Sequence, residues 1–74
     1  MNHGIYAVVK IIENNKSVVW YCKSDDHYSV YERMIKLTNN NHELSSDAAS
    51  WCELATVGEI YEFENGEIEI QEID

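Results

Sequence analysis

Three histidines and two cysteines are the side chains best suited to bind a metal ion or to attack a substrate: His3, His27, His42, Cys22 and Cys52. Structural zinc sites usually contain two cysteines separated by about two to four residues or two histidines separated by about three to five, and this sequence has neither pair. Here four residues separate Cys22 from His27, and nine separate His42 from Cys52. A nucleophilic cysteine also needs a base and a group that orients the base, and no such motif surrounds Cys52. The sequence therefore predicts neither a metal site nor a catalytic residue.

Other features with chemical meaning have structural explanations. Asp25 and Asp26 lie where carboxylates cap the start of a helix, which accounts for both without a bound cation. Three scattered glycines do not form a phosphate-binding loop. The aromatic residues fit the spacing of a core, because a platform that stacks nucleic-acid bases also needs basic neighbours. We expect no enzyme activity and no cofactor.

The remaining reactive groups are carboxylates, and they are densest near the C-terminal end of the sequence. Residues 59–64 and 67–72 alternate acidic and apolar side chains on either side of Asn65-Gly66. Asn-Gly between alternating segments predicts a hairpin with a two-residue turn. This turn sets five pairs opposite each other: Glu64 and Glu67, Phe63 and Ile68, Glu62 and Glu69, Tyr61 and Ile70, and Ile60 and Gln71.

Because strand side chains alternate, the aromatic and isoleucine pairs face the core and the glutamates share the other face. Two opposed like-charge pairs destabilise a sheet, here by about 1–3 kcal/mol of the roughly 5 kcal/mol expected for a domain of this size. We expect this acidic face to dock on a basic surface of a partner protein, with the repulsion relieved on binding. The predicted contact residues are Glu59, Glu62, Glu64, Glu67, Glu69, Glu72 and Asp74.

The same face has an alternative interpretation. Glutamates on an exposed hairpin also keep a protein soluble and discourage edge-to-edge aggregation. The chain would then be an oligomerisation or scaffold module that acts through a sheet edge or through apolar surface near Trp20 and Tyr21. The sequence leaves open whether Lys10, Lys23 or Lys36 covers the acidic face.

Charge is unevenly distributed along the chain. Fourteen acidic and five basic residues give a net charge of −9 and a pI near 4.5. Residues 1–36 contain five bases and four acids, a net charge of +1, whereas residues 37–74 contain ten acids and no lysine or arginine, a net charge of −10. An acidic surface repels DNA, RNA and anionic lipid, which argues against direct nucleic-acid or membrane binding and favours a basic protein partner.

Size and charge together resemble those of phage-encoded inhibitors, which include DNA mimics and anti-CRISPR proteins. The resemblance is one of class and rests on no matched motif. It implies an inhibitor that occludes the nucleic-acid-binding surface of another protein.

The N-terminal part of the sequence predicts a first hairpin. Residues 5–12 are rich in β-branched side chains and apolar on both faces, which is typical of a central strand. Asn14-Asn15 supplies a tight turn, because asparagine tolerates positive φ, and residues 17–23 form the second strand. The predicted register pairs Lys16 with Glu13, Val18 with Ile11, Trp20 with Val9, and Cys22 with Ala7.

A first helix is expected after this hairpin. Residues 24–26 offer N-caps to a helix over residues 27–38, with Arg33 among the charged residues that face water. An asparagine-rich loop over residues 39–41 follows. A brief strand over residues 43–45 is one option for the next segment.

A second, short helix is expected over residues 48–55. Residues 45–47 offer serine and aspartate caps at its start, and Gly58 marks its exit. Its apolar face contains Ala48, Trp51, Cys52 and Ala55.

Together these elements predict an α+β fold and a single domain over residues 1–74. Two antiparallel hairpins form one sheet, two short helices pack on one face, and the strand over residues 5–12 lies centrally. The sequence starts without the basic and apolar regions of a signal peptide, and its apolar runs are far shorter than the ~18 residues of a membrane span. Two cysteines are too few for a disulfide framework, so we expect a cytoplasmic protein with reduced thiols.

Overall fold

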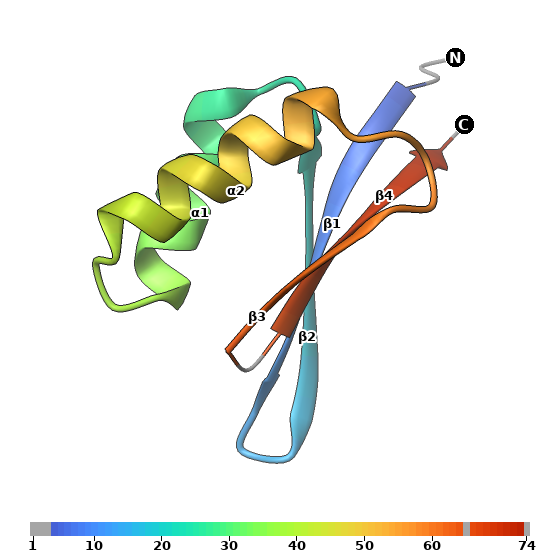
Figure 1. Ribbon diagram of the computed structural model, residues 1–74. Helices are drawn as coiled ribbons and strands as arrows, with labels where there is room; N and C mark the ends of the chain where they lie inside the picture. Colours follow the sequence, from blue (N-terminus) through green and yellow to red (C-terminus); the bar gives the residue numbers. More distant parts are fainter. Residues whose placement is uncertain (1–3, 65, 74) are drawn as a thin grey trace.

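The computed structural model describes residues 4–64 and 66–73, which form four antiparallel strands in one sheet and two helices (Figure 1). The elements are β1 (Gly4–Glu13), β2 (Lys16–Lys23), α1 (His27–Leu37), α2 (His42–Leu54), β3 (Ile60–Phe63) and β4 (Gly66–Ile73). The strand order is β2-β1-β4-β3, so β1 joins the two hairpins. The predicted α+β class and the central position of the first strand are confirmed.

The first hairpin has the predicted turn and register. Asn14 and Asn15 both adopt positive φ, at 53° and 64°. This is the conformation that a two-residue turn needs if its twist is to match that of the strands. Glu13 lies opposite Lys16, and every other predicted pair of this hairpin is also present.

The first helix begins and ends close to the prediction, whereas the second begins earlier. Asp26 caps α1 by accepting a hydrogen bond from the Ser29 backbone N–H. The predicted start of the second helix at residue 48, and the brief strand at 43–45, are wrong. Asn41 caps α2, so residues 45–47 lie inside the helix. Ser45 fits there because its hydroxyl donates to the Asn41 carbonyl oxygen one turn back.

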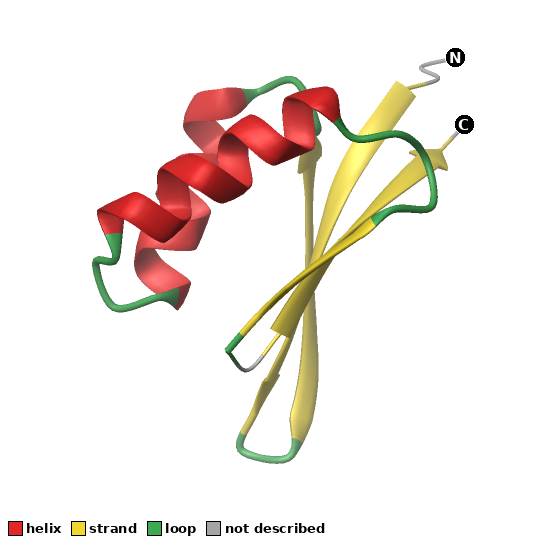
Figure 2. Cartoon of the chain, in the orientation of Figure 1, coloured by secondary structure: helices red, strands yellow, loops and turns green. Residues whose placement is uncertain are grey.

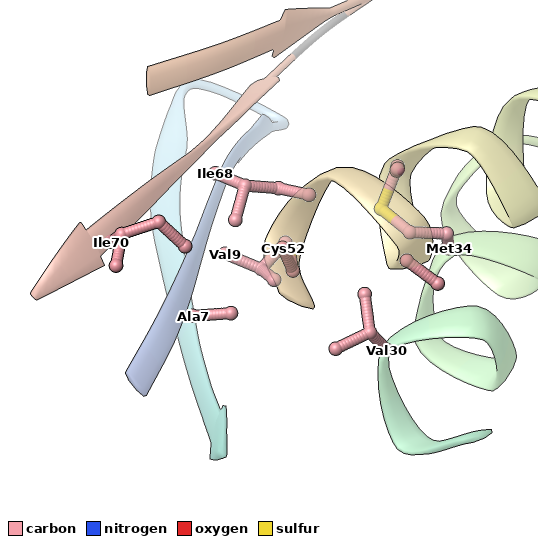
Figure 3. Packing of buried hydrophobic residues seen from close by; sticks show 9 residues of the cluster. Ala7, Val9, Val30, Met34, Cys52, Ile68 and Ile70 are labelled. Carbon is pink, nitrogen blue, oxygen red and sulfur yellow. The ribbon is translucent and has the colours of Figure 1, made fainter. Parts of the chain in front are cut away.

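Both helices pack against the same face of the sheet (Figure 2). Side chains from β1, β4 and both helices meet in one buried cluster (Figure 3), which contains Ala7, Val9, Val30, Met34, Ala48, Ala49, Cys52, Ile68 and Ile70. This shared core makes the stability of each helix depend on the sheet, because short helices are marginal alone in water.

Each helix contacts a different part of the sheet. The Arg33 guanidinium of α1 lies 3.1 Å from the ring centroid of Trp20 on β2, so the prediction that Arg33 faces water is wrong. The Trp51 ring of α2 lies 5.3 Å from the Tyr61 ring of β3. The molecule therefore has two lateral halves: the N-terminal half, made of β1, β2 and α1, and the C-terminal half, made of α2, β3 and β4.

The second hairpin forms, but its predicted register is wrong by two residues. Tyr61 lies opposite Ile68, and Phe63 lies opposite Gly66. Gly66 is therefore a strand residue, whereas the turn prediction for Asn65 lies outside the described residues. A shift of two keeps the residues of both strands on their predicted faces, because strand side chains alternate with a period of two, whereas Glu64 falls in the turn.

Close backbone approach explains the position of Gly66. A Cβ atom added there would lie 2.5 Å from the Lys10 carbonyl oxygen and 2.9 Å from the Phe63 ring. Glycine thus allows β1 and the Phe63 ring to approach β4 closely, and aromatic cover of a strand glycine is a known way to stabilise a sheet. The shift also leaves Glu62 opposite Glu67 as the one directly opposed glutamate pair of this hairpin among the described residues.

Candidate functional site

The sheet has an open face, defined here as the face turned away from both helices. The strand registers place two rows of side chains across it. From β2 to β3, the first row contains Val19, Lys10, Glu67 and Glu62, and the second contains Tyr21, Val8, Glu69 and Ile60. Three of the predicted contact residues, Glu62, Glu67 and Glu69, therefore share this face as expected.

Lys10 neutralises part of the acidic surface. Its Nζ lies 2.7 Å from Glu69 Oε1, and Gln71 Nε2 donates to the same oxygen at 3.0 Å. The hydrogen bond from Lys10 lowers the pKa of Glu69, and the same bond raises the pKa of Lys10. Lys10 from the N-terminal half thus covers one predicted contact residue, a point that the sequence left open.

Glu62 and Glu67 remain a like-charge pair. They lie directly opposite each other on β3 and β4, and Lys10 is the opposing residue of Glu67 on β1. Within residues 4–64 and 66–73, no lysine or arginine nitrogen comes within ion-pair distance of either carboxylate. Opposed like charges at this spacing destabilise a sheet by about 0.2–1 kcal/mol.

The other predicted contact residues lie elsewhere. Glu64 is in the turn after β3 and, with Leu37 of α1, lines a hollow on the helix side. Glu59 accepts hydrogen bonds from the backbone N–H and hydroxyl of Thr56, which closes the loop before β3. Glu72 lies opposite Ile5, on the face that also carries Ile70. Asp74 lies outside the described residues.

Two acidic residues of α2 add to the negative charge of the C-terminal half on the helix side of the sheet, and they were not predicted as contact residues. Glu43 and Asp47, one helical turn apart, line a hollow of about 660 Å³ together with Tyr61 of β3. The Tyr61 hydroxyl donates to Asp47 Oδ2 at 3.1 Å, and partial burial followed by this bond raises the pKa of Tyr61. The i, i+4 spacing of Glu43 and Asp47 is visible in the sequence. The helix was predicted to begin only at residue 48, so neither residue was assigned to it.

In the N-terminal half, three of the bases have local contacts. Lys23 lies 5.2 Å from the centroid of the Tyr6 ring, Arg33 stacks on Trp20, and Lys10 bonds to Glu69 across the boundary between the halves. Cations over aromatic rings are stabilised by the ring quadrupole. Three of the five bases of this half are thus engaged within the molecule, whereas the carboxylates of the other half largely face solvent.

The histidines and cysteines do not assemble into a reactive centre in the described part of the chain. Burial raises the pKa of Cys52 to about 12, and burial also raises the pKa of Cys22, so neither thiol is activated. His27 Nδ1 lies 3.2 Å from Glu53, and His42 Nδ1 lies 2.6 Å from the Tyr31 hydroxyl, both as links between the helices. No group of three potential metal ligands occurs within residues 4–64 and 66–73, and His3 lies outside them.

Neither α1 nor α2, the helices of the described chain, has the length and apolar character needed to cross a membrane. No family model, curated protein or solved structure matches the chain. Any functional conclusion must therefore come from the surface itself.

Proposed function

We propose that this protein is a binding module whose acidic C-terminal half docks on a basic, nucleic-acid-binding surface of a partner protein and occludes it. One observation carries the proposal: the charge asymmetry of the sequence becomes an asymmetry in space. The half made of α2, β3 and β4 comes from the segment with ten acids and no lysine or arginine. Such a one-sided field favours association with cations and sets the orientation of approach.

The local geometry adds a reason for binding to be favourable. Glu62 and Glu67 repel each other in the free protein, and a partner ammonium or guanidinium between them removes that repulsion. Glu43 and Asp47 of α2 add carboxylates on the helix side of the sheet, around the hollow that Tyr61 also lines. The C-terminal half therefore presents carboxylates on both sides of the sheet.

A competition experiment tests the proposal. The full chain is added to complexes of basic nucleic-acid-binding proteins with labelled DNA or RNA, at about 50 mM and about 500 mM NaCl. We expect displacement of nucleic acid from a susceptible partner at low salt, and a loss of roughly tenfold or more in affinity for that partner at high salt. Binding that is indifferent to salt, or that leaves the nucleic acid in place, would overturn the proposal.

A second candidate function is self-association, which is favoured by exposed apolar side chains on the open face. Ile12, Val19, Tyr21 and Ile60 are all exposed there, and β2 is an eight-residue edge strand. Exposed apolar patches and free strand edges are typical of interfaces between chains. Sedimentation separates the two candidates: an oligomer that persists when Glu62 and Glu67 become Lys favours self-association, and a monomer argues against it.

A further inference from the structure

The two outer strands of the sheet differ in how well their edges are protected against pairing with another chain. β2 has eight residues, and those from Ser17 to Cys22 carry no charge. β3 has four residues and contains Glu62, with Glu59 directly before the strand and Glu64 directly after it. Proteins protect an edge strand by keeping it short or by placing charges on it, because its unpaired backbone groups can bind another strand. β3 has both forms of protection, and the interior of β2 has neither.

The outward backbone groups of β2 belong to alternate residues. The Ser24 N–H donates to the Ile5 carbonyl oxygen at 3.1 Å, which continues the β1–β2 ladder past the end of β2. Because hydrogen-bonded pairs alternate along an antiparallel ladder, the even-numbered residues of β2 bond to β1. The N–H and C=O groups that point outward include those of Ser17, Val19 and Tyr21. Within residues 4–64 and 66–73, no backbone hydrogen bond outside the ladders involves these three residues.

The apolar side chains of β2 are also only partly covered, on both faces of the sheet. On the open face, Val19 is 41% exposed and Tyr21 is 60% exposed. On the helix side, Trp20 is half-buried, whereas its opposing residue on β1, Val9, is buried. A further strand beside β2 would therefore cover apolar side chains on both faces and supply partners for the outward backbone groups.

We infer that two copies of this chain pair through β2, antiparallel and about a two-fold axis that passes beside Trp20. This inference rests on the self-association candidate and specifies its interface. An axis at Trp20, in the middle of the strand, overlaps β2 along its length and opposes residues that share a face. It places Val19 of each copy opposite Tyr21 of the other, a β-branched and aromatic pair of the kind that stabilises sheets. It also places Lys23 opposite Ser17, so that no two lysines are directly opposed.

The distribution of charge favours a second copy as the occupant of this edge. The half that contains β2 comes from the segment with a net charge of +1, and the strand order places the acidic β4 and β3 beyond β1. In the dimer the two β4 strands are separated by five strand spacings, about 24 Å, which is about three Debye lengths at physiological salt. The same register brings Lys16 of each copy to the end of the other β2, where Asp25 and Asp26 follow. Charges near the axis therefore attract, and the acidic halves remain at the two outer ends.

Sedimentation velocity of the full chain tests the inference with a lysine placed at either edge. Val19→Lys and Ile60→Lys each replace an exposed apolar residue of the open face, on β2 and β3 respectively, and change the net charge equally. In the dimer, a lysine at position 19 would lie diagonally across from its own copy and from Lys23 of the second copy. We expect the parent chain and Ile60→Lys to form dimers as concentration rises, and Val19→Lys to dimerise at least roughly tenfold more weakly.

Amide hydrogen exchange, followed by nuclear magnetic resonance on the parent chain, identifies the paired strand without a variant. The outward N–H groups of Val19 and Tyr21 should exchange slowly at about 1 mM protein and faster at about 50 µM, because dilution dissociates the dimer. The N–H of Trp20 is the control, since it bonds to β1 and should be protected at both concentrations. Rapid exchange of Val19 and Tyr21 at both concentrations would overturn the inference even if Val19→Lys failed to fold.

The other outcomes separate this inference from the functions proposed above. A dimer that Val19→Lys leaves intact, or that Ile60→Lys weakens as strongly, retains self-association and overturns the β2 interface. A monomer at every concentration overturns both. Docking on a basic partner is judged separately by its loss at high salt, whereas the β2 dimer should persist at about 500 mM NaCl because backbone hydrogen bonds and apolar contacts hold it together. A dimer that dissociates at that salt concentration would contradict the inference.

Discussion

The two lateral halves of this molecule share one core but treat charge in opposite ways. In the N-terminal half, positive groups have partners close by: Arg33 stacks on Trp20, and Lys16 lies opposite Glu13. In the C-terminal half, Glu62 lies opposite Glu67. The first arrangement stabilises the free protein, and the second lowers its stability.

This difference teaches that the opposed carboxylates of the acidic half are not required by the fold. Apolar packing of Ile68 and Ile70 against β1 and the helices accounts for the position of β4. Glu62 and Glu67 on the opposite face contribute repulsion instead, and solubility alone does not require that they be directly opposed. Stability therefore comes mainly from the shared core, and the acidic surface remains available for the partner binding that we propose.

The largest expected effect tests whether the halves fold as one unit. Ile68→Ala should destabilise the protein by about 2–5 kcal/mol, because the fully buried side chain leaves a cavity in the shared core. Urea unfolding is followed in Trp51→Phe and Trp20→Phe backgrounds, so that the remaining tryptophan reports on one half at a time. Coincident midpoints are expected from both reporters, and separate midpoints would show that the halves are independent.

The second prediction concerns the register of the β3–β4 hairpin, which opposes one pair of glutamates instead of two. Gly66→Ala should cost about 2 kcal/mol or more, because its Cβ would lie 2.5 Å from a backbone oxygen of β1. Gly58→Ala is the control, since nothing lies within 4 Å of its added Cβ and only its φ of 98° is unfavourable, at about 1–2 kcal/mol. Cross-strand nuclear Overhauser effects should connect Tyr61 with Ile68; backbone pairing of Tyr61 with Ile70 would refute the register.

The third prediction, with a smaller expected effect, compares one glutamate-to-lysine change in each half. Glu62→Lys replaces repulsion with attraction to Glu67, whereas Glu13→Lys places a lysine opposite Lys16. Both variants have the same net charge. The difference between their stabilities therefore reflects the local cross-strand charge pairs and not the total charge. We expect Glu62→Lys to be the more stable by about 1 kcal/mol in thermal unfolding; equal stabilities would mean that the opposed glutamates do not strain the free protein.

The smallest effect concerns the ion pair that joins the halves. The pKa of Glu69 is lowered by Lys10, so its stabilising contribution is present above the ordinary value of 4.5 and is lost as pH falls through the lowered pKa. The pKa of Lys10 is raised by the same bond, so its contribution is present below 10.5 and is lost only above that value.

Lys10→Met should therefore be less stable than the parent at about pH 7, and this difference should be smaller at about pH 3, below the ordinary pKa of Glu69. Thermal unfolding at both pH values measures the gap. An equal difference in stability at both pH values would mean that Lys10 stabilises the protein through the packing of its aliphatic chain.

Local signals predicted much of the fold. Asn14-Asn15 fixes its own turn and thereby the register of the first hairpin, and Asp26 caps α1 by itself. The failures involve distant groups. The position of Gly66 depends on a carbonyl of β1, more than fifty residues earlier in the chain, and the sequence shows only that Asn-Gly favours a turn.

The acidic surface could be predicted only in part, again because some of its contacts join segments that are distant in the sequence. Strand alternation is enough to place Glu62, Glu67 and Glu69 on one face. The bond from Lys10 to Glu69 requires the β1–β4 pairing, which no local motif specifies. The start of α2 was also misjudged, because Ser45 looks like a cap and instead bonds back within the helix.

The most direct test of the central claim compares two double reversals that change net charge equally. Glu62→Lys with Glu67→Lys alters the acidic half, and Glu13→Lys with Glu32→Lys alters the other half. Binding to immobilised poly-lysine at about 50 mM NaCl should weaken roughly tenfold more in the first variant than in the second. Equal losses in the two variants would contradict the claim, since attraction would then follow total charge and not the acidic half.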